Sequence, residues 1–211
     1  MKSIFISFEG PEGAGKSTVL SMVLPVLSKI REIVSTREPG GVRIAEDIRK
    51  IVLGRENTAL DAKSEMLLFA AARRVHLLEK IKPALEAGKV VLADRFIDSS
   101  VAYQGYAGGV KVDEVKWLNN FATDGLKPDL TLYFDIAPEI GLARVMHADE
   151  REKNRLDLAN LAYHQKVVEG YLKLCEAEPE RIVKIDASRS PEEVAQDVLS
   201  AIFERFPGEF A

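Results

Sequence analysis

The sequence feature that most restricts the fold is a glycine-rich run placed directly after an apolar segment. Residues 10 to 17 follow the spacing G-x-x-x-x-G-K-S, and the apolar residues 4 to 8 precede them. Such a loop, between a strand and a helix, surrounds a polyphosphate with backbone N–H groups at the positive end of the helix. In this pattern Lys16 reaches the β- and γ-phosphates and Ser17 is a ligand for Mg²⁺. The alternative is a glycine-rich turn without a ligand, but the full set of matching positions favours nucleoside triphosphate binding.

Composition predicts one compact domain, residues 1–211, that works in the cytoplasm. The chain has 211 residues and a net charge of −4, so it can bury one core but offers no broad basic surface for nucleic acid. Its single cysteine, Cys175, excludes an intrachain disulfide, and with only three histidines we expect no Cys/His metal site. No apolar run approaches membrane-spanning length, and the first residues show no signal-peptide pattern. We therefore expect neither a membrane nor a nucleic acid as partner.

Short apolar runs alternate with longer helical patterns, which indicates an α/β fold with a parallel sheet covered by helices on both faces. The expected strands cover residues 3–8, 32–36, 89–94, 130–135 and 181–185. The expected helices cover residues 16–29, 42–54, 61–87, 98–107, 112–122, 138–147, 157–176 and 191–205. Residues 148–158 are strongly charged, and this composition fits either a mobile loop or a solvated helix face.

A second candidate site lies where the third expected strand ends, at Asp94 and Arg95. The carboxyl ends of neighbouring parallel strands open into one crevice, so Asp94 is expected to face the phosphate loop and to hold Mg²⁺ directly or through water. Arg95 offers a planar fork of donors for a second phosphate group. Asp94 alone could simply cap the following helix. The pair instead suits a site in which one phosphorylated molecule transfers a phosphoryl group to another.

Several further strings carry a family resemblance. They are Phe8-Glu9-Gly10, Thr36-Arg37-Glu38-Pro39-Gly40-Gly41, Leu68-Phe69-Ala70-Ala71-Ala72-Arg73, and Asp94-Arg95-Phe96 followed by Ser99-Ser100-Val101-Ala102-Tyr103-Gln104-Gly105. Over nearly its whole length the chain resembles the thymidylate kinase family, which uses ATP to convert deoxythymidine monophosphate (dTMP) to the diphosphate (dTDP) for dTTP synthesis. The resemblance implies a P-loop nucleoside-monophosphate-kinase fold: a five-stranded parallel sheet of order 2-3-1-4-5, flanked by helices. It also implies a homodimer formed through helices.

The resemblance further implies an acceptor site for dTMP. Phe69 would stack on the thymine ring, and Arg73, one helical turn later, would donate to the carbonyl edge of the base. Tyr103 would lie against the sugar and crowd out a 2′-hydroxyl. The implied substrate-binding residues are Glu38, Arg49, Phe69, Arg73, Arg95, Ser99, Ser100, Tyr103 and Gln104. His76 and His164 are expected to be structural, because the acceptor is a phosphate oxygen that needs no general base.

For the donor, the resemblance implies a site for ATP and Mg²⁺. Its ATP-binding residues would be Gly10, Pro11, Glu12, Gly13, Ala14, Gly15, Lys16, Ser17, Thr18 and, on adenine, Arg144, with Ser17 and Asp94 at the metal. Glu12 would lie near the acceptor's 3′-hydroxyl. Family members carry a catalytic arginine either in the phosphate loop or in a lid, and residues 11–14 contain none. We therefore expect the bacterial type, with a lid at about residues 144–157.

The expected lid contains three basic residues, Arg151, Lys153 and Arg155, and one or two of them would close over the transferring phosphoryl group. Which of the three does so stays open. The implied catalytic residues are Lys16, Arg95, Glu12, Arg151 and Arg155.

Three other functions remain to be weighed. A kinase for another nucleotide or for a deoxynucleoside would lack Arg49 and Arg95 as a monophosphate clamp. A GTPase-like switch needs an Asn-Lys-x-Asp string to read guanine, and this sequence has none. A regulatory protein that has lost turnover could keep the same fold, although the intact Lys16, Ser17 and Asp94 speak against it.

Overall fold

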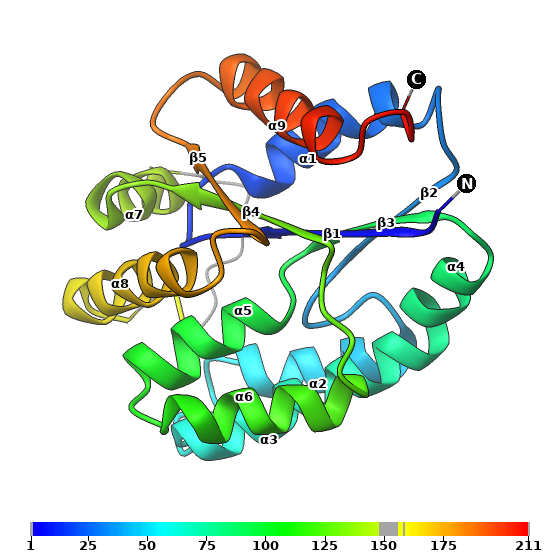
Figure 1. Ribbon diagram of the computed structural model, residues 1–211. Coiled ribbons are helices and arrows are strands. Elements are labelled where there is room, and N and C mark those ends of the chain that lie inside the picture. Colours follow the sequence, from blue (N-terminus) through cyan, green and yellow to red (C-terminus); the bar gives the residue numbers. More distant parts are fainter. Residues whose placement is uncertain (1, 148–155, 158, 211) are drawn as a thin grey trace.

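The computed structural model describes residues 2–147, 156–157 and 159–210. Its centre is one parallel sheet with the order β2-β3-β1-β4-β5 (Figure 1). The strands are β1 (Ile4–Glu9), β2 (Ile33–Arg37), β3 (Val90–Asp94), β4 (Leu130–Asp135) and β5 (Ile182–Asp186). All four pairings are parallel, and each strand lies within one residue of its predicted position. The predicted fold class and strand order are therefore confirmed.

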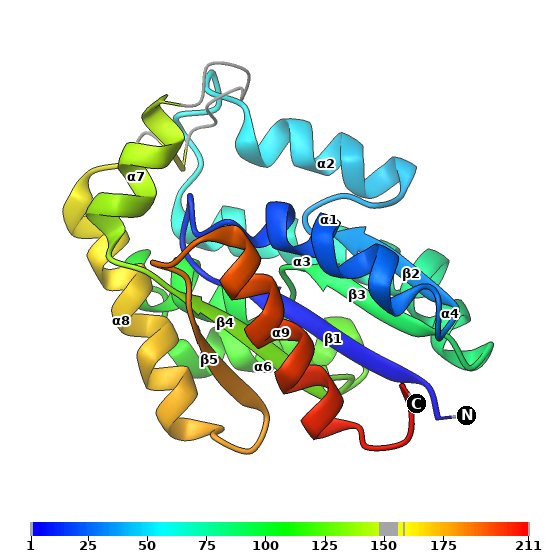
Figure 2. The ribbon, with the colours of Figure 1, turned by 90° about the horizontal axis from the view of Figure 1, so that it is seen from above.

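Helices cover both faces of this sheet. On one face lie α1 (Lys16–Leu27) and α9 (Pro191–Arg205), which run side by side (Figures 1 and 2). The opposite side is covered by α2 (Arg43–Leu53), α3 (Ala62–His76), α4 (Lys82–Glu86), α5 (Ile97–Ser100), α6 (Val112–Thr123) and α8 (Leu161–Ala177). The remaining helix, α7 (Pro138–His147), packs against α8. Among the described residues no helix is both long enough and apolar enough to cross a membrane.

The central strand β1 shows how this layering follows from the sequence. Its six residues are all buried, as expected for a parallel strand with helices on both faces. Ile4, Ile6 and Phe8 belong to the core shared with α1 and α9. Phe5 packs in the opposite core, and Glu9, four residues further along, faces the same side. Strand periodicity thus directs a carboxylate into the interior directly beside the phosphate loop.

The structure differs from the predicted helices at three places. The helix expected over residues 61–87 is interrupted by a π-helical segment, η1 (Leu77–Ile81), between α3 and α4. Pro83 explains the wider turn, because it has no N–H for the carbonyl four residues earlier and its ring would clash with that carbonyl. A similar segment, η2 (Val101–Ala107), follows α5. Helix α8 begins later than predicted, after Asn160, whose side chain accepts a hydrogen bond from the N–H of Tyr163.

Candidate active site

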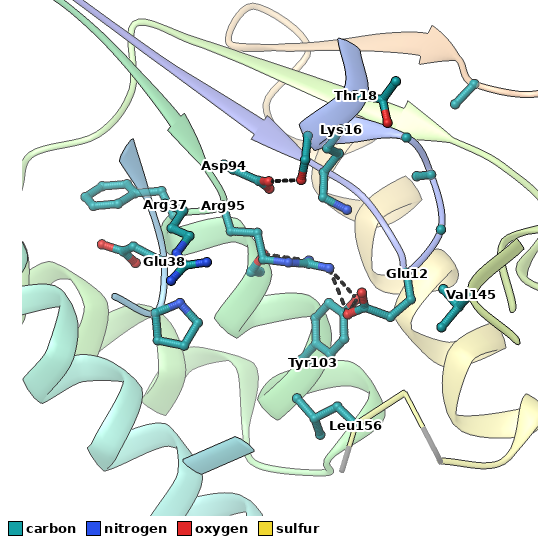
Figure 3. A pocket seen from close by; sticks show the side chains of 18 of the residues that line it. Glu12, Lys16, Thr18, Arg37, Glu38, Asp94, Arg95, Tyr103, Val145 and Leu156 are labelled. Atoms are coloured by element: carbon teal, nitrogen blue, oxygen red, sulfur yellow. Dashed lines mark hydrogen bonds and ion pairs between the residues drawn. The ribbon is translucent and has the colours of Figure 1, made fainter. Parts of the chain in front are cut away.

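A cavity of about 660 Å³ lies at the carboxyl ends of the central strands (Figure 3). Its volume is typical of a small-molecule site. It is lined by nearly all the predicted site residues: Glu12, Gly13, Ala14, Gly15, Lys16, Ser17, Thr18, Glu38, Arg49, Phe69, Arg73, Asp94, Arg95, Ser99, Ser100, Tyr103, Gln104 and Arg144. Gly10 and Pro11 lie behind it and offer their carbonyl groups to Lys16. The predicted lid residues Arg151, Lys153 and Arg155 lie outside the described residues.

The phosphate loop owes its shape to its glycines. Gly10, Gly13 and Gly15 have φ angles of 146°, 70° and 84°, in the region that side chains rarely adopt. At Gly13 there is also no room for a side chain, because an added Cβ would collide with the backbone of Gly141 on α7. The loop is therefore fixed by backbone geometry and leads directly into the first turn of α1.

Lys16 is held inside this loop by two backbone carbonyl groups. Its Nζ donates to the carbonyl oxygens of Gly10 and Pro11, at 3.0 and 2.8 Å. Burial lowers the pKa of Lys16 to about 8, and nearby Arg95 acts in the same direction. A poorly hydrated ammonium group in this position gains from an anionic ligand, because a phosphate would add negative charge directly beside it.

Two oxygen groups meet at the other side of the loop. The Ser17 hydroxyl donates to an oxygen of Asp94 at 2.6 Å (Figure 3). A hydroxyl and a carboxylate are the hard oxygen donors that Mg²⁺ takes together with phosphate oxygens. The donor set at Ser17 and Asp94 therefore fits this ion.

Arg95 lies between the phosphate loop and the part of the cavity that Tyr103 lines. Its Nη1 donates to the carbonyl of Gly10 at 2.9 Å, and its Nη2 donates to Glu12 at 2.8 Å and to the Tyr103 hydroxyl at 3.2 Å. The Tyr103 hydroxyl in turn donates to Glu12 at 3.1 Å (Figure 3). Arg95 also has a φ of 74°, which is uncommon for a residue with a side chain. Such backbone outliers persist where the surroundings hold them in place.

Arg73 lies deeper than its predicted role requires, because only 2% of it is exposed. Its Nε donates to Glu38 at 2.7 Å, and its Nη1 donates to Ser100 at 3.1 Å and to Asn119 at 2.5 Å. Its Nη2 donates to the carbonyl of Phe96 at 3.0 Å. Within the part of the chain that the structure describes, four of its five N–H donors have protein partners and one on Nη2 has none.

The loop after β2 is held by side-chain contacts to one of its backbone carbonyl groups and to one of its carboxylates. Arg49 of α2 donates to the carbonyl of Pro39 at 2.8 Å. Glu38 binds Arg73 and also contacts His76 at 3.1 Å. His76 is completely buried and lies 2.6 Å from the Thr36 hydroxyl.

Sequence reasoning missed part of the donor side. Arg189, Pro191 and Val194 line the cavity from the loop after β5 and the start of α9. The predicted adenine neighbour, Arg144, donates to the carbonyl of Ala187 at 3.2 Å and so reaches the same loop. The position of this loop at the carboxyl end of an outer parallel strand was the signal that could have found it.

Two buried groups behind Arg95 were missed as well. Glu9 and Tyr171 contact each other at 2.9 Å although 162 residues separate them in the sequence. For Glu9 the available signal was a carboxylate inside an apolar run next to the phosphate loop. Nothing in the sequence around Tyr171 distinguishes it from an ordinary core residue.

A phosphate loop that faces a partly buried arginine, Arg95, across one cavity, at the carboxyl ends of a 2-3-1-4-5 parallel sheet, defines a P-loop kinase acting on a phosphorylated acceptor. The family model described as thymidylate kinase matches residues 8–198. The crystal structure of thymidylate kinase from Ehrlichia chaffeensis is similar, with a TM-score of 0.78 and 31% sequence identity over 96% of this chain and 99% of that one. The chain belongs to the thymidylate kinase family, and its reaction is the ATP-dependent phosphorylation of dTMP to dTDP.

Proposed function

We propose that this cavity performs the transfer with ATP on the phosphate loop and dTMP beside α3 and η2. The observation that carries the proposal is the position of Arg95, which contacts the loop through Gly10 and the acceptor side through Tyr103. A guanidinium group placed there can hold the acceptor phosphate close to the γ-phosphate of the donor. Positioning of this kind supplies much of the rate in phosphoryl transfer.

The acceptor phosphate would be clamped by Arg49 and Arg95, both of which line the cavity. Burial, together with the neighbouring Arg37, lowers the pKa of Arg49, so an added anion stabilises its charged form. The acceptor oxygen is already deprotonated at neutral pH, so the protein need not supply a general base.

The base and sugar would lie against Phe69 and Tyr103, with the one remaining Arg73 donor directed to the carbonyl edge of thymine. Glu12 would then approach the 3′-hydroxyl, a role supported by its contact with Tyr103. Ser99 and Gln104 line the same part of the cavity.

Mg²⁺ would be held by Ser17 and Asp94 and by oxygens of ATP. When bound, the ion neutralises charge on the phosphate oxygens. Lys16 would exchange its contacts with the loop carbonyls for the β- and γ-phosphates, and the backbone N–H groups of the loop would surround the rest.

We further propose one functional domain, residues 1–211, with a bacterial-type lid at about residues 144–157 that carries Arg151, Lys153 and Arg155. The absence of arginine from positions 11–14 of the phosphate loop supports this assignment. We also propose a cytoplasmic location, which fits the acidic composition and the single cysteine.

The homodimer would form through the outer face of α3 and α6. Leu67, Trp117 and Phe121 are 58%, 66% and 69% exposed there, and the two aromatic rings stack on each other. Exposed apolar groups of this size on neighbouring helices favour burial against a second copy of the same face. In sedimentation experiments the double substitution Trp117→Lys with Phe121→Lys should convert a dimer to a monomer; a wild-type monomer would contradict the proposal.

The decisive test of function is ADP formation with ATP and Mg²⁺ and a panel of monophosphates of deoxythymidine, deoxyuridine, deoxycytidine, adenosine and guanosine. We expect the highest kcat/KM with dTMP. Preference for another monophosphate would overturn the base assignment and leave the phosphate chemistry in place. No turnover with any of them would favour a regulatory protein.

A further inference from the structure

A buried carboxylate, Glu9, lies directly behind the strained turn at Arg95. Its side chain is at the end of β1, is fully buried and is not among the residues that line the cavity. A carboxylate in such a position is costly unless it is well supplied with hydrogen bonds.

One oxygen of Glu9 holds the backbone of the turn. Oε1 accepts from the N–H of Phe96 at 2.7 Å, the peptide group that directly follows Arg95. This peptide group is attached to the Cα atom of Arg95, so its direction depends on the backbone conformation of Arg95, which has a φ of 74°. A contact that fixes the Phe96 N–H thus favours the left-handed conformation over the ordinary ones.

The other oxygen of Glu9 reaches the guanidinium group itself through two hydroxyls. Oε2 accepts from Ser99 at 2.6 Å and from Tyr171 at 2.9 Å. Nη1 of Arg95 lies 3.2 Å from the Ser99 hydroxyl and 3.4 Å from the Tyr171 hydroxyl; since one of its two hydrogens is directed to Gly10, the two hydroxyls share the other. Each hydroxyl therefore accepts from the arginine and donates to the carboxylate, an arrangement that only an acceptor at position 9 can complete.

We propose that Glu9 is a positioning residue, whose two carboxylate oxygens set the backbone turn at Arg95 and, through Ser99 and Tyr171, the orientation of its guanidinium group. This inference rests on the proposed role of Arg95 as the clamp on the acceptor phosphate. Glu9 itself touches neither substrate. Its effect is on how well the acceptor is aligned with the donor.

Glu9 differs from the neighbouring buried acid Asp98 in how its charge is compensated. Asp98, on α5, is bound by both terminal nitrogens of Arg181 at 2.7 Å, so a direct ion pair compensates its charge. Glu9 has no such direct cation among the contacts that the structure describes, and the nearby Asp98 acts against its ionisation. Burial, followed by the charge of Asp98, raises the pKa of Glu9 to about 7. An acid kept at this cost is better explained by what it positions than by stability.

The test uses Glu9→Gln in the full chain, assayed at pH 8 with dTMP and ATP varied separately. Glutamine can keep the contact with the Phe96 N–H, but it then presents an amide NH₂ to Ser99 and Tyr171 and cannot complete the two-hydroxyl arrangement. We expect kcat/KM for dTMP to fall by roughly 10- to 100-fold, with the KM for ATP within about twofold of wild type. The matched control is Glu209→Gln, which alters the partner of another buried arginine, Arg31, far from the cavity, and should leave both constants unchanged.

A second variant guards against a general folding defect. Tyr171→Phe removes one of the two hydroxyls but keeps the ring, which stacks on Tyr133 at 5.0 Å. It should lower kcat/KM for dTMP by several-fold and leave the KM for ATP unchanged. If Glu9→Gln and Tyr171→Phe both keep wild-type kcat/KM for dTMP, Glu9 is structural only and the inference is wrong.

A double mutant of Glu9 and Arg95 tests the positioning role of Glu9 separately from the clamp role of Arg95. In an Arg95→Ala background, Glu9→Gln should cause less than about a twofold further loss, because its effect passes through the missing guanidinium group. Additive losses would overturn the positioning role and leave the clamp in place. If Arg95→Ala alone left kcat/KM for dTMP unchanged, the clamp assignment itself would fail.

Discussion

The phosphate loop and the proposed clamp around Arg95 meet in the same cavity but are built in opposite ways. The loop is made of consecutive residues, and its shape comes from glycines in conformations that other residues avoid. The proposed clamp consists of Arg95, which directly follows β3, and of side chains from β1, α5, η2 and α8 that contact it or its partners; among these, Glu9 and Tyr171 come together across 162 residues. One half of the site, the phosphate loop, is thus local in sequence, and its shape depends on the backbone. The other exists only after the whole sheet has assembled.

This difference has a consequence for mutation. In the loop, a change should act on binding of the donor and on the local backbone. In the clamp, a change at one side chain should spread through its hydrogen-bond partners and appear in the handling of the acceptor. Measurements that separate effects on ATP from effects on dTMP therefore test this difference between the loop and the clamp.

The largest effect is expected for Lys16→Ala, the main charged side chain of the loop. Loss of its ammonium group should lower kcat by about 10³-fold, because it removes charge stabilisation from the transferring phosphoryl group. Steady-state kinetics with ATP and dTMP would measure this. A loss confined to the KM for dTMP would place Lys16 on the acceptor side and contradict the division of the site.

Arg95→Ala should have the next largest effect, a fall of about 10²-fold in kcat/KM for dTMP. ATP binding, measured by titration calorimetry without acceptor, should stay close to wild type, since the donor lies mainly on the loop. Equal losses of turnover and ATP affinity would show that Arg95 serves the donor instead.

Gly13→Ala tests the backbone half. The substitution forces a side chain into a φ of 70° and against the carbonyl of Gly141, which we expect to cost roughly 3 kcal/mol in the free energy of unfolding. Gly15→Ala is the matched control, because its φ of 84° is similar but nothing lies within 4 Å of the added atom. Equal losses in chemical denaturation would mean that contact with α7 contributes nothing.

The smallest effect concerns pH and the clamp half. The folded-state pKa of Glu9 is about 7, above its usual value of 4.5, so folding favours the protonated acid. That contribution to stability is complete below pH 4.5 and is lost as the pH rises through 7. Denaturation of wild type and Glu9→Gln at several pH values should show wild type losing on the order of 2 kcal/mol relative to the variant between pH 4.5 and 8. If the stability of wild type and of Glu9→Gln changed equally with pH, this prediction would be wrong.

Much of the fold was predictable, because strand runs and helical periodicity are local signals. All five strands were placed within one residue, and the loop residues Lys16 and Ser17 were identified from spacing alone. The π-helical segment before α4 was missed although Pro83 marks it, because its effect is on the turn that precedes it. The depth of Arg73 was missed because its partners Glu38 and Asn119 come from distant elements.

Residue order alone was enough to establish the parallel α/β fold, the phosphate loop and, through its matching strings, the family to which the chain belongs. Those features depend on residue order over short distances, where backbone conformation and side-chain periodicity follow from the residue types. Only the tertiary structure decided which buried groups surround Arg95 and how many donors Arg73 keeps for a ligand. Such contacts join side chains that are remote in sequence, and their geometry is set by the packing of the complete sheet and its helices.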